Sequence, residues 1–153
     1  MISAPEVITT EAQIAAVIRL TIPRAEMRSV FGPAVGELLK AIAAQGVEPV
    51  GGVFAHHLRM TPDTFDFELG IKVSAPVTAS GRVQPGSLPA VRAVRTVYSG
   101  GYEGLPDAWG AFMTWIKDHG HAPAEDLWEL YAVGPQSSGN PADWRTELVR
   151  PLT

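Results

Sequence analysis

The chain has 153 residues, with 12 Lys and Arg against 16 Asp and Glu, and therefore a formal net charge of −4. Hydrophobic residues make up 46% of the sequence and charged residues 18%, a balance that favours one folded domain over a disordered or coiled-coil chain. The acidic balance argues against nucleic-acid binding, and the absence of Cys excludes disulfides, thiol nucleophiles and thiolate metal sites.

The N-terminal segment MISAPEVITTE has no basic stretch, and Glu6 and Glu11 stand where a secretory signal would be apolar. The longest stretch free of Asp, Glu, Lys and Arg is residues 130–142, which is 13 residues and contains Gly and Pro. A membrane-spanning helix needs about 20 apolar residues. We therefore expect a cytoplasmic protein without membrane contact.

Residues 13–21 are rich in Ile, Val and Leu, which predicts a buried strand. A helix is expected over 27–45, followed by Gly46 as a left-handed C-terminal cap. The apolar residues of this helix recur at spacings of three and four and should form one face: Phe31, Val35, Leu38, Leu39 and Ile42. Residues 52–60 and 65–73 then predict a hairpin across the turn sequence TPDT.

Residues 74–89 are dense in Gly, Pro and Ser and predict a linker. Residues 91–98 predict another strand, and a second helix follows and ends at Gly120. Its apolar stripe consists of Leu105, Ala108, Trp109, Phe112 and Ile116. A second hairpin is expected to pair 127–133 with 144–149 across a loop rich in Ser, Gly, Asn and Pro.

The two halves of the sequence match without a gap at an offset of 74 residues. This offset places Gly46 on Gly120 and Phe54 on Trp128. We therefore expect an α+β fold built by tandem duplication of a strand-helix-strand-strand unit, with antiparallel sheets and two main helices. The whole chain, 1–153, should form one pseudo-two-fold domain with half 1 at about 12–73, half 2 at about 90–152 and a central cleft between the halves.

Alternation along the strand at 127–131 places Glu129 and Tyr131 on one face, with Trp128 on the other. All four Trp residues lie in the second half, an aromatic density that suits a concave apolar site with a few polar groups. A solvated outer face of the sheet would also explain Glu129. Tyr102 follows two glycines just before the second helix, and both a pocket wall and an exposed loop residue fit that position.

The only histidines occur as His56-His57 and as His119 with His121. Adjacent residues of a strand point to opposite faces, so His56 and His57 cannot hold one metal from one face. No G-x-S-x-G, G-x-G-x-x-G or P-loop motif occurs. We expect no metal, no cofactor and no Ser-His-Asp triad.

Four segments resemble the GyrI-like small-molecule-binding domain, also called the AraC-type effector-binding domain. They are GGVFAHHLRMTPDTFDFELGIKV, PAVRAVRTVYSGGYEGLPDAWGAFMTWIKDHG, WELYAVGP and WRTELVRPL. The resemblance covers residues 12–152 and implies the same duplicated fold. Nothing in the chain resembles a helix-turn-helix, so we expect a stand-alone version of the domain.

The resemblance also implies which residues bind the ligand. Glu129 in WELY matches the family's pocket carboxylate, and His57 stands where the family commonly has Tyr. The other candidate ligand-binding residues are Tyr131, Tyr102, Trp109, Phe54 and Glu147. Trp109 is also expected to pack in the core, and Glu147 is expected to have either a structural or a binding role.

The resemblance implies binding of a small lipophilic or cationic molecule, for effector sensing or xenobiotic sequestration, with a separate transcription regulator as a partner. A buried Glu129 without a basic partner has a raised pKa, and a cationic ligand would restore the missing charge. The alternative is a hydrolase of strained-ring, cyclopropane-bearing genotoxins that uses Glu129 and Tyr131 in the same pocket. A further alternative is a protein-interaction or toxin-antagonist module.

Overall fold

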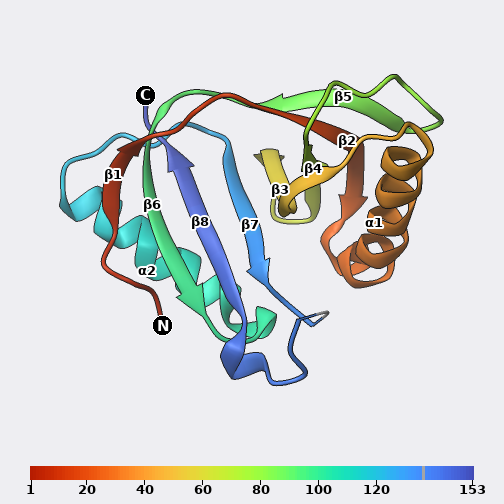
Figure 1. Cartoon of the computed structure of the whole chain (residues 1–153). Coiled ribbons are helices and arrows are strands. Elements are labelled where there is room, and N and C mark those ends of the chain that lie inside the picture. Colours follow the sequence, from red (N-terminus) through yellow and green to blue (C-terminus); the bar gives the residue numbers. More distant parts are fainter. Residues whose placement is uncertain (136) are drawn as a thin grey trace. The chain divides into compact units, whose positions relative to one another are not determined.

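The computed structural model describes residues 1–135 and 137–153, and these divide into two units. Unit 1 contains Met1–Thr10 and Val91–Thr153, and unit 2 contains Glu11–Ala90. Each unit has four antiparallel strands and one long helix (Figure 1). The expected α+β class with antiparallel strands and two main helices is therefore confirmed.

Unit 2 has the strand order β3-β4-β2-β5. Its elements are β2 (Gln13–Pro23), η1 (Arg24–Glu26), α1 (Met27–Ala44), β3 (Pro49–Met60), β4 (Thr64–Val73) and β5 (Val83–Leu88). The β3–β4 hairpin has the expected antiparallel pairing, and Gly46 ends α1 with φ 67°. The expected apolar face of α1 was wrong at Leu39, which is 45% exposed. Leu38 and Ile42 are buried as expected, and Ala34 is buried with them, because a spacing of four keeps the three residues on one side of the helix.

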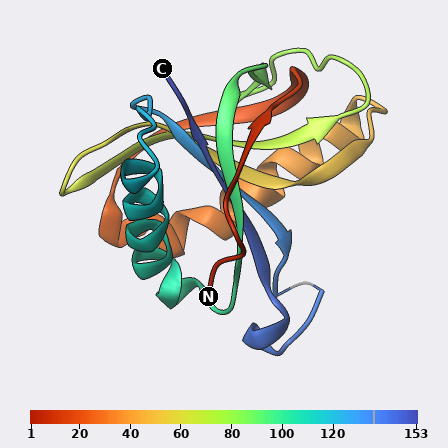
Figure 2. The same ribbon diagram turned by 90° about the vertical axis from the view of Figure 1, so that its left-hand side faces the viewer.

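Unit 1 has the strand order β1-β6-β8-β7. Its elements are β1 (Glu6–Thr9), β6 (Arg92–Ser99), η2 (Tyr102–Gly104), α2 (Leu105–Asp118), β7 (Leu127–Val133), η3 (Pro141–Asp143) and β8 (Arg145–Pro151). Helix α2 packs on one face of this sheet through Ala108, Phe112 and Ile116, which form a core with Val94 and Leu148. Figure 2 shows the N-terminal segment, in red, running alongside β6, in green, with which β1 pairs.

In each unit, one edge strand lies outside the half that the sequence repeat predicts, 12–73 for unit 2 and 90–152 for unit 1. Strand β1 precedes β2 in the chain but pairs with β6, whereas β5 precedes β6 but pairs with β2. Residues 83–88, which we expected in a linker, therefore form a strand. Pro85 is tolerated there because β5 lies at an edge of its unit's sheet, and Gly86 leaves room for the side chain of Val17.

Both units follow the connectivity strand, helix, strand, strand, as β2-α1-β3-β4 and β6-α2-β7-β8. The strand orders also correspond when each is read from the edge strand outside the repeat: β1-β6-β8-β7 in unit 1 and β5-β2-β4-β3 in unit 2. This agreement supports a duplication, while the two-fold axis and the cleft between the halves remain predictions. Within the described part of the chain, neither helix has the length and apolar character needed to cross a membrane.

Candidate functional site

Glu129 lies on β7, on the face of the unit 1 sheet against which α2 packs. Its pairing partner on β8 is Leu148, a member of the core beneath α2. Tyr131 is two residues further along β7 and therefore projects from the same face. Both side chains are buried, with 8% of Glu129 and 8% of Tyr131 exposed. The alternative explanation of Glu129, a solvated outer face of the sheet, is therefore wrong.

The carboxylate of Glu129 accepts two hydrogen bonds from neutral donors. The indole Nε1 of Trp109 donates to Oε2 at 2.7 Å, and the hydroxyl of Tyr131 donates to Oε1 at 2.8 Å. Burial raises the pKa of Glu129 above its ordinary value, and the two hydrogen bonds only partly oppose this effect. Within residues 1–135 and 137–153, no Lys, Arg or His forms an ion pair with this carboxylate.

Two tyrosines extend this arrangement. Burial raises the pKa of the Tyr131 hydroxyl well above its ordinary value, and the nearby charge of Glu129 adds to the shift. The Tyr102 ring meets the Tyr131 ring edge to face, with 5.8 Å between centroids. Tyr102 is only partly buried, and its pKa is raised by burial and by the charge of Glu129. Tyr102 is therefore the more accessible phenol beside the buried carboxylate.

The glycine-rich loop before α2 determines where Tyr102 lies. The hydroxyl of Tyr98 donates to the backbone oxygen of Gly101 at 2.7 Å. A Cβ on Gly100 or on Gly104 would collide with that hydroxyl, and Gly100 has φ 136°, a region that favours glycine. The loop therefore requires glycine at these positions to close over Tyr98 and present Tyr102.

Trp109 combines the two roles expected for it. Its ring packs beside Phe112 at 5.6 Å, at the border of the α2 core, while its Nε1 donates to Glu129. Helix α2 thus supplies both a hydrophobic wall and a polar contact to the carboxylate.

Glu147 does not join Glu129. It pairs with Leu130 across β7 and β8, and adjacent strand residues alternate between faces, so Glu147 projects from the opposite face. There its Oε1 accepts a hydrogen bond from Arg95 Nε at 2.6 Å, and Arg95 also lies 3.5 Å from Glu6. The structure therefore places this acid in an ion pair on the far side of the sheet, in agreement with its structural alternative.

The two candidates from the first half lie in unit 2. His57 is 4% exposed and contacts Phe65 and Phe67, each at 5.1 Å between ring centroids. Burial, assisted by His56 and Arg24, lowers the pKa of His57 to about 4, so its ring is neutral at pH 7. Phe54 is fully buried, and its ring occupies the space that a side chain at Gly70 would need. Both residues therefore have clear packing roles within unit 2.

Trp144 was not among the expected site residues. Its ring lies 5.0 Å from the Tyr102 ring, and its Nε1 donates to the backbone oxygen of Ser138 at 2.9 Å. The only signal in the sequence was its membership of the four Trp residues of the second half. Strand alternation cannot relate Trp144, which lies just before β8, to Tyr102, which lies just before α2.

Solved structures with the same fold belong to proteins of several kinds. The EcmrR C-terminal domain matches with a TM-score of 0.86 and 21% identity, over 98% of this chain and 97% of that domain. In the EcmrR–DNA complex the TM-score is 0.85 at 21% identity, and the match covers 97% of this chain and 57% of the EcmrR chain. This chain thus spans little more than half the length of EcmrR.

Two further structures are more distant. A hydrolase encoded by lin2189 from Listeria innocua matches with a TM-score of 0.69 and 12% identity, over 97% of this chain and 91% of that one. SAV2435 bound to tetraphenylphosphonium matches with a TM-score of 0.67 and 10% identity, over 99% of this chain and 94% of that one. No curated protein sequence matches the chain.

The resemblance in the strands and in the glycine-rich loop is matched by a family model that spans almost the whole chain. The model of the GyrI-like small molecule binding domain aligns with residues 3–153. The chain therefore belongs to the GyrI-like small-molecule-binding domain family.

Proposed function

We propose that this protein binds small lipophilic cations, with Glu129 as the anionic partner of the ligand. The observation that carries the proposal is a buried carboxylate whose hydrogen-bond partners, Trp109 and Tyr131, are both neutral. The family supports a small-molecule ligand, and the related fold of SAV2435 is bound to a lipophilic cation, tetraphenylphosphonium.

Burying a carboxylate without a counter-charge is unfavourable, and this penalty is relieved when a cation arrives. A lipophilic cation is weakly hydrated, so its own transfer from water to the site costs less than that of an ammonium ion. We expect the neighbouring rings of Tyr102, Tyr131 and Trp109 to add cation–π attraction. The site therefore favours a charged ligand with an apolar body over a neutral one.

The first experiment titrates the protein with tetraphenylphosphonium and follows tryptophan fluorescence, to which Trp109 contributes beside the carboxylate. Glu129→Gln keeps the shape of the side chain and can still accept a hydrogen bond from Trp109. We expect the variant to bind at least about tenfold more weakly, the equivalent of about 1.4 kcal/mol. Glu147→Gln is the matched control, because it removes a carboxylate from the opposite face of the same sheet. Equal affinity of Glu129→Gln and the wild type would contradict the charge-pairing role.

A second experiment separates charge from shape. Methyltriphenylphosphonium and neutral triphenylphosphine oxide have similar bodies but differ in charge. We expect the wild type to prefer the cation and the Glu129→Gln variant to lose most of that preference. Because the ionised carboxylate is the binding form and the pKa of Glu129 is raised, affinity for the cation should also increase as pH rises through that pKa. A neutral ligand that binds as tightly as the cation would refute the proposal.

Hydrolysis of a strained ring in the same pocket is the second candidate. It is favoured by the hydrogen-bonded pair of Glu129 and Tyr131, both with raised pKa values, and by the shared fold of the Listeria innocua hydrolase. We expect binding without turnover. Incubation with a cyclopropane-bearing alkylating compound, followed by chromatography, tests this: repeated turnovers that are lost in both Glu129→Gln and Tyr131→Phe would establish the hydrolase instead.

The biological role that we propose is effector sensing or xenobiotic sequestration in the cytoplasm. In the sensing case, a separate transcription regulator would read the ligand-bound state. The EcmrR C-terminal domain, whose full chain is seen in a DNA complex, supports this role by its fold. A ligand-dependent change in the affinity for such a regulator, measured by co-purification with and without tetraphenylphosphonium, is the expected result.

A further inference from the structure

Three aromatic rings of unit 1 lie in a row that ends at the carboxylate of Glu129. Trp144 lies 5.0 Å from Tyr102, and Tyr102 lies 5.8 Å from Tyr131 between ring centroids. The Tyr131 hydroxyl then donates to Glu129 at 2.8 Å. The row comes from three separate segments: Tyr102 begins η2, Tyr131 lies on β7, and Trp144 lies between η3 and β8.

The loop that precedes β8 holds Trp144 in place by several hydrogen bonds. The Trp144 Nε1 donates to the backbone oxygen of Ser138 at 2.9 Å, and the Ser138 hydroxyl donates to Asp143 at 2.8 Å. The side chain of Asn140 accepts from the backbone nitrogen of Ala142, which starts the turn η3. These contacts define the position of the indole without help from a ligand.

The backbone of Trp144 is hydrogen-bonded to the glycine-rich loop before α2. The nitrogen of Gly100 donates to the backbone oxygen of Trp144 at 3.2 Å. Because Tyr102 follows two residues after Gly100, the backbone bond and the ring contact hold Trp144 and Tyr102 together. The pair therefore behaves as one preorganised surface, which reduces the entropy lost when a ligand binds.

Accessibility changes along the row. Glu129 and Tyr131 are each 8% exposed, whereas Tyr102 and Trp144 are only partly buried. The exposed end of the row is the Trp144 ring, which reaches the carboxylate only through Tyr102 and Tyr131. A compact cation has no apolar body that would reach this surface, but a cation carrying several aromatic rings does.

We propose that Trp144 is a specificity-determining residue, which together with Tyr102 selects cations that carry several aromatic rings over compact aliphatic cations. This inference rests on the proposed binding of cations at Glu129. It adds a requirement on the body of the ligand, supplied by residues that do not touch the carboxylate.

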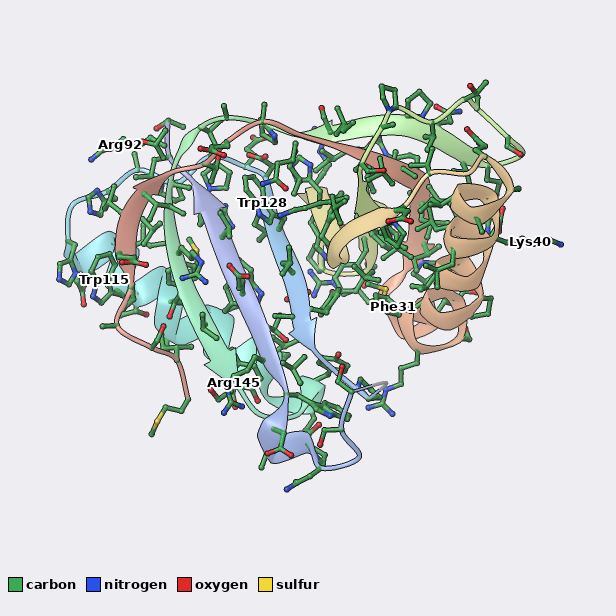
Figure 3. All side chains as sticks on the ribbon, in the orientation of Figure 1. Phe31, Lys40, Arg92, Trp115, Trp128 and Arg145 are labelled. Atoms are coloured by element: carbon green, nitrogen blue, oxygen red, sulfur yellow. The ribbon has the colours of Figure 1, made fainter. Side chains whose placement is uncertain are left out.

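The test compares tetraphenylphosphonium with tetraethylphosphonium, which has the same charge and central atom but no rings. We expect Trp144→Leu to weaken binding of tetraphenylphosphonium roughly 3- to 10-fold, the range of an aromatic contact, and to leave tetraethylphosphonium within about twofold of the wild type. Trp115→Leu is the matched control. Trp115 lies on α2 and stacks on His119 at 3.8 Å, and Figure 3 places it far from Arg145, the residue after Trp144.

A purely structural role for Trp144 is tested by Trp144→Phe, which keeps an aromatic ring but loses the hydrogen bond to Ser138. We expect this variant to retain most of the affinity for tetraphenylphosphonium. Weakening of both ligands alike by Trp144→Leu, or equal weakening by Trp144→Phe and Trp144→Leu, would overturn the inference, because loop anchoring rather than ring contact would then set the affinity.

The indole N–H signals in nitrogen-15 NMR spectra give an independent measurement. Addition of tetraphenylphosphonium should shift the signals of Trp109 and Trp144 but not that of Trp115. Only the present inference fails if the Trp109 signal shifts and Glu129→Gln weakens binding, but the Trp144 signal does not shift and Trp144→Leu binds as tightly as the wild type. If no signal shifts and Glu129→Gln has no effect, the proposed function fails as well.

Discussion

The buried His57 should make the stability of this protein sensitive to acid, and replacing it with Phe should remove that sensitivity. His57 is 4% exposed, contacts Phe65 and Phe67, and its Nδ1 has no hydrogen-bond partner among the described residues. An apolar ring of similar shape can therefore take its place at neutral pH. We expect His57→Phe to change the free energy of unfolding at pH 7 by less than about 1.5 kcal/mol.

The magnitude of the acid effect follows from the pKa of His57. Burial first, then the charges of His56 and Arg24, lower this pKa from 6.5 to about 4 in the folded protein. Between these two pH values the unfolded chain binds a proton that the folded chain does not, so stability decreases as pH falls through this window. The full shift corresponds to about 3 kcal/mol of lost stability.

Urea unfolding followed by circular dichroism, from pH 7.5 down to pH 4, measures this effect for the wild type and for His57→Phe. The variant should lose about 3 kcal/mol less than the wild type over this range. Taking the difference between the two proteins removes the contribution of other groups, including Glu129, whose raised pKa acts in the opposite direction. His119→Phe, which removes an exposed imidazole, is the control. Parallel curves for the wild type and His57→Phe would refute the reasoning.

Three further substitutions should change the stability of the protein. Glu129→Gln should stabilise the protein by on the order of 1 kcal/mol at pH 8, because it removes a buried charge. The gain in stability should decrease as the pH falls, since Glu129 of the wild type then becomes protonated. A loss of stability at pH 8 would contradict this prediction. Gly70→Ala should destabilise by about 1–3 kcal/mol, since its Cβ would collide with the buried Phe54 ring, whereas Gly36→Ala on the exposed side of α1 should stabilise by about 0.5–1 kcal/mol in thermal unfolding.

Local patterns in the sequence were sufficient to predict most elements and part of the site. Hydrophobic spacing located both helices, and the glycines at 46 and 120 end them with φ values of 67° and 74°. Strand alternation alone placed Glu129 and Tyr131 on one face, where they form a hydrogen bond. These features depend on the period of 3.6 residues in a helix and of 2 residues in a strand. A short segment shows either period in its own sequence, without contacts to other segments.

The partners of those residues were decided only by the tertiary structure. Periodicity shows which face of an element is apolar, but it does not show which other element packs there. The sequence therefore did not predict that Trp109, 20 residues before Glu129, donates to its carboxylate, or that Trp144 contacts Tyr102. It also left open whether Glu147 is a binding residue or the partner of Arg95.

The exchange of edge strands shows the same limit in the backbone. Strand β1 pairs with β6, and β5 pairs with β2, through main-chain hydrogen bonds that leave no pattern in the side chains. Strand β5 also contains Pro85 and Gly86, which are unusual in strands. The sequence by itself thus determined the repeated strand-helix-strand-strand order and the face on which Glu129 lies. Only the tertiary structure decided which strands complete each sheet and which neutral donors surround the carboxylate, because both depend on contacts between segments far apart in the chain.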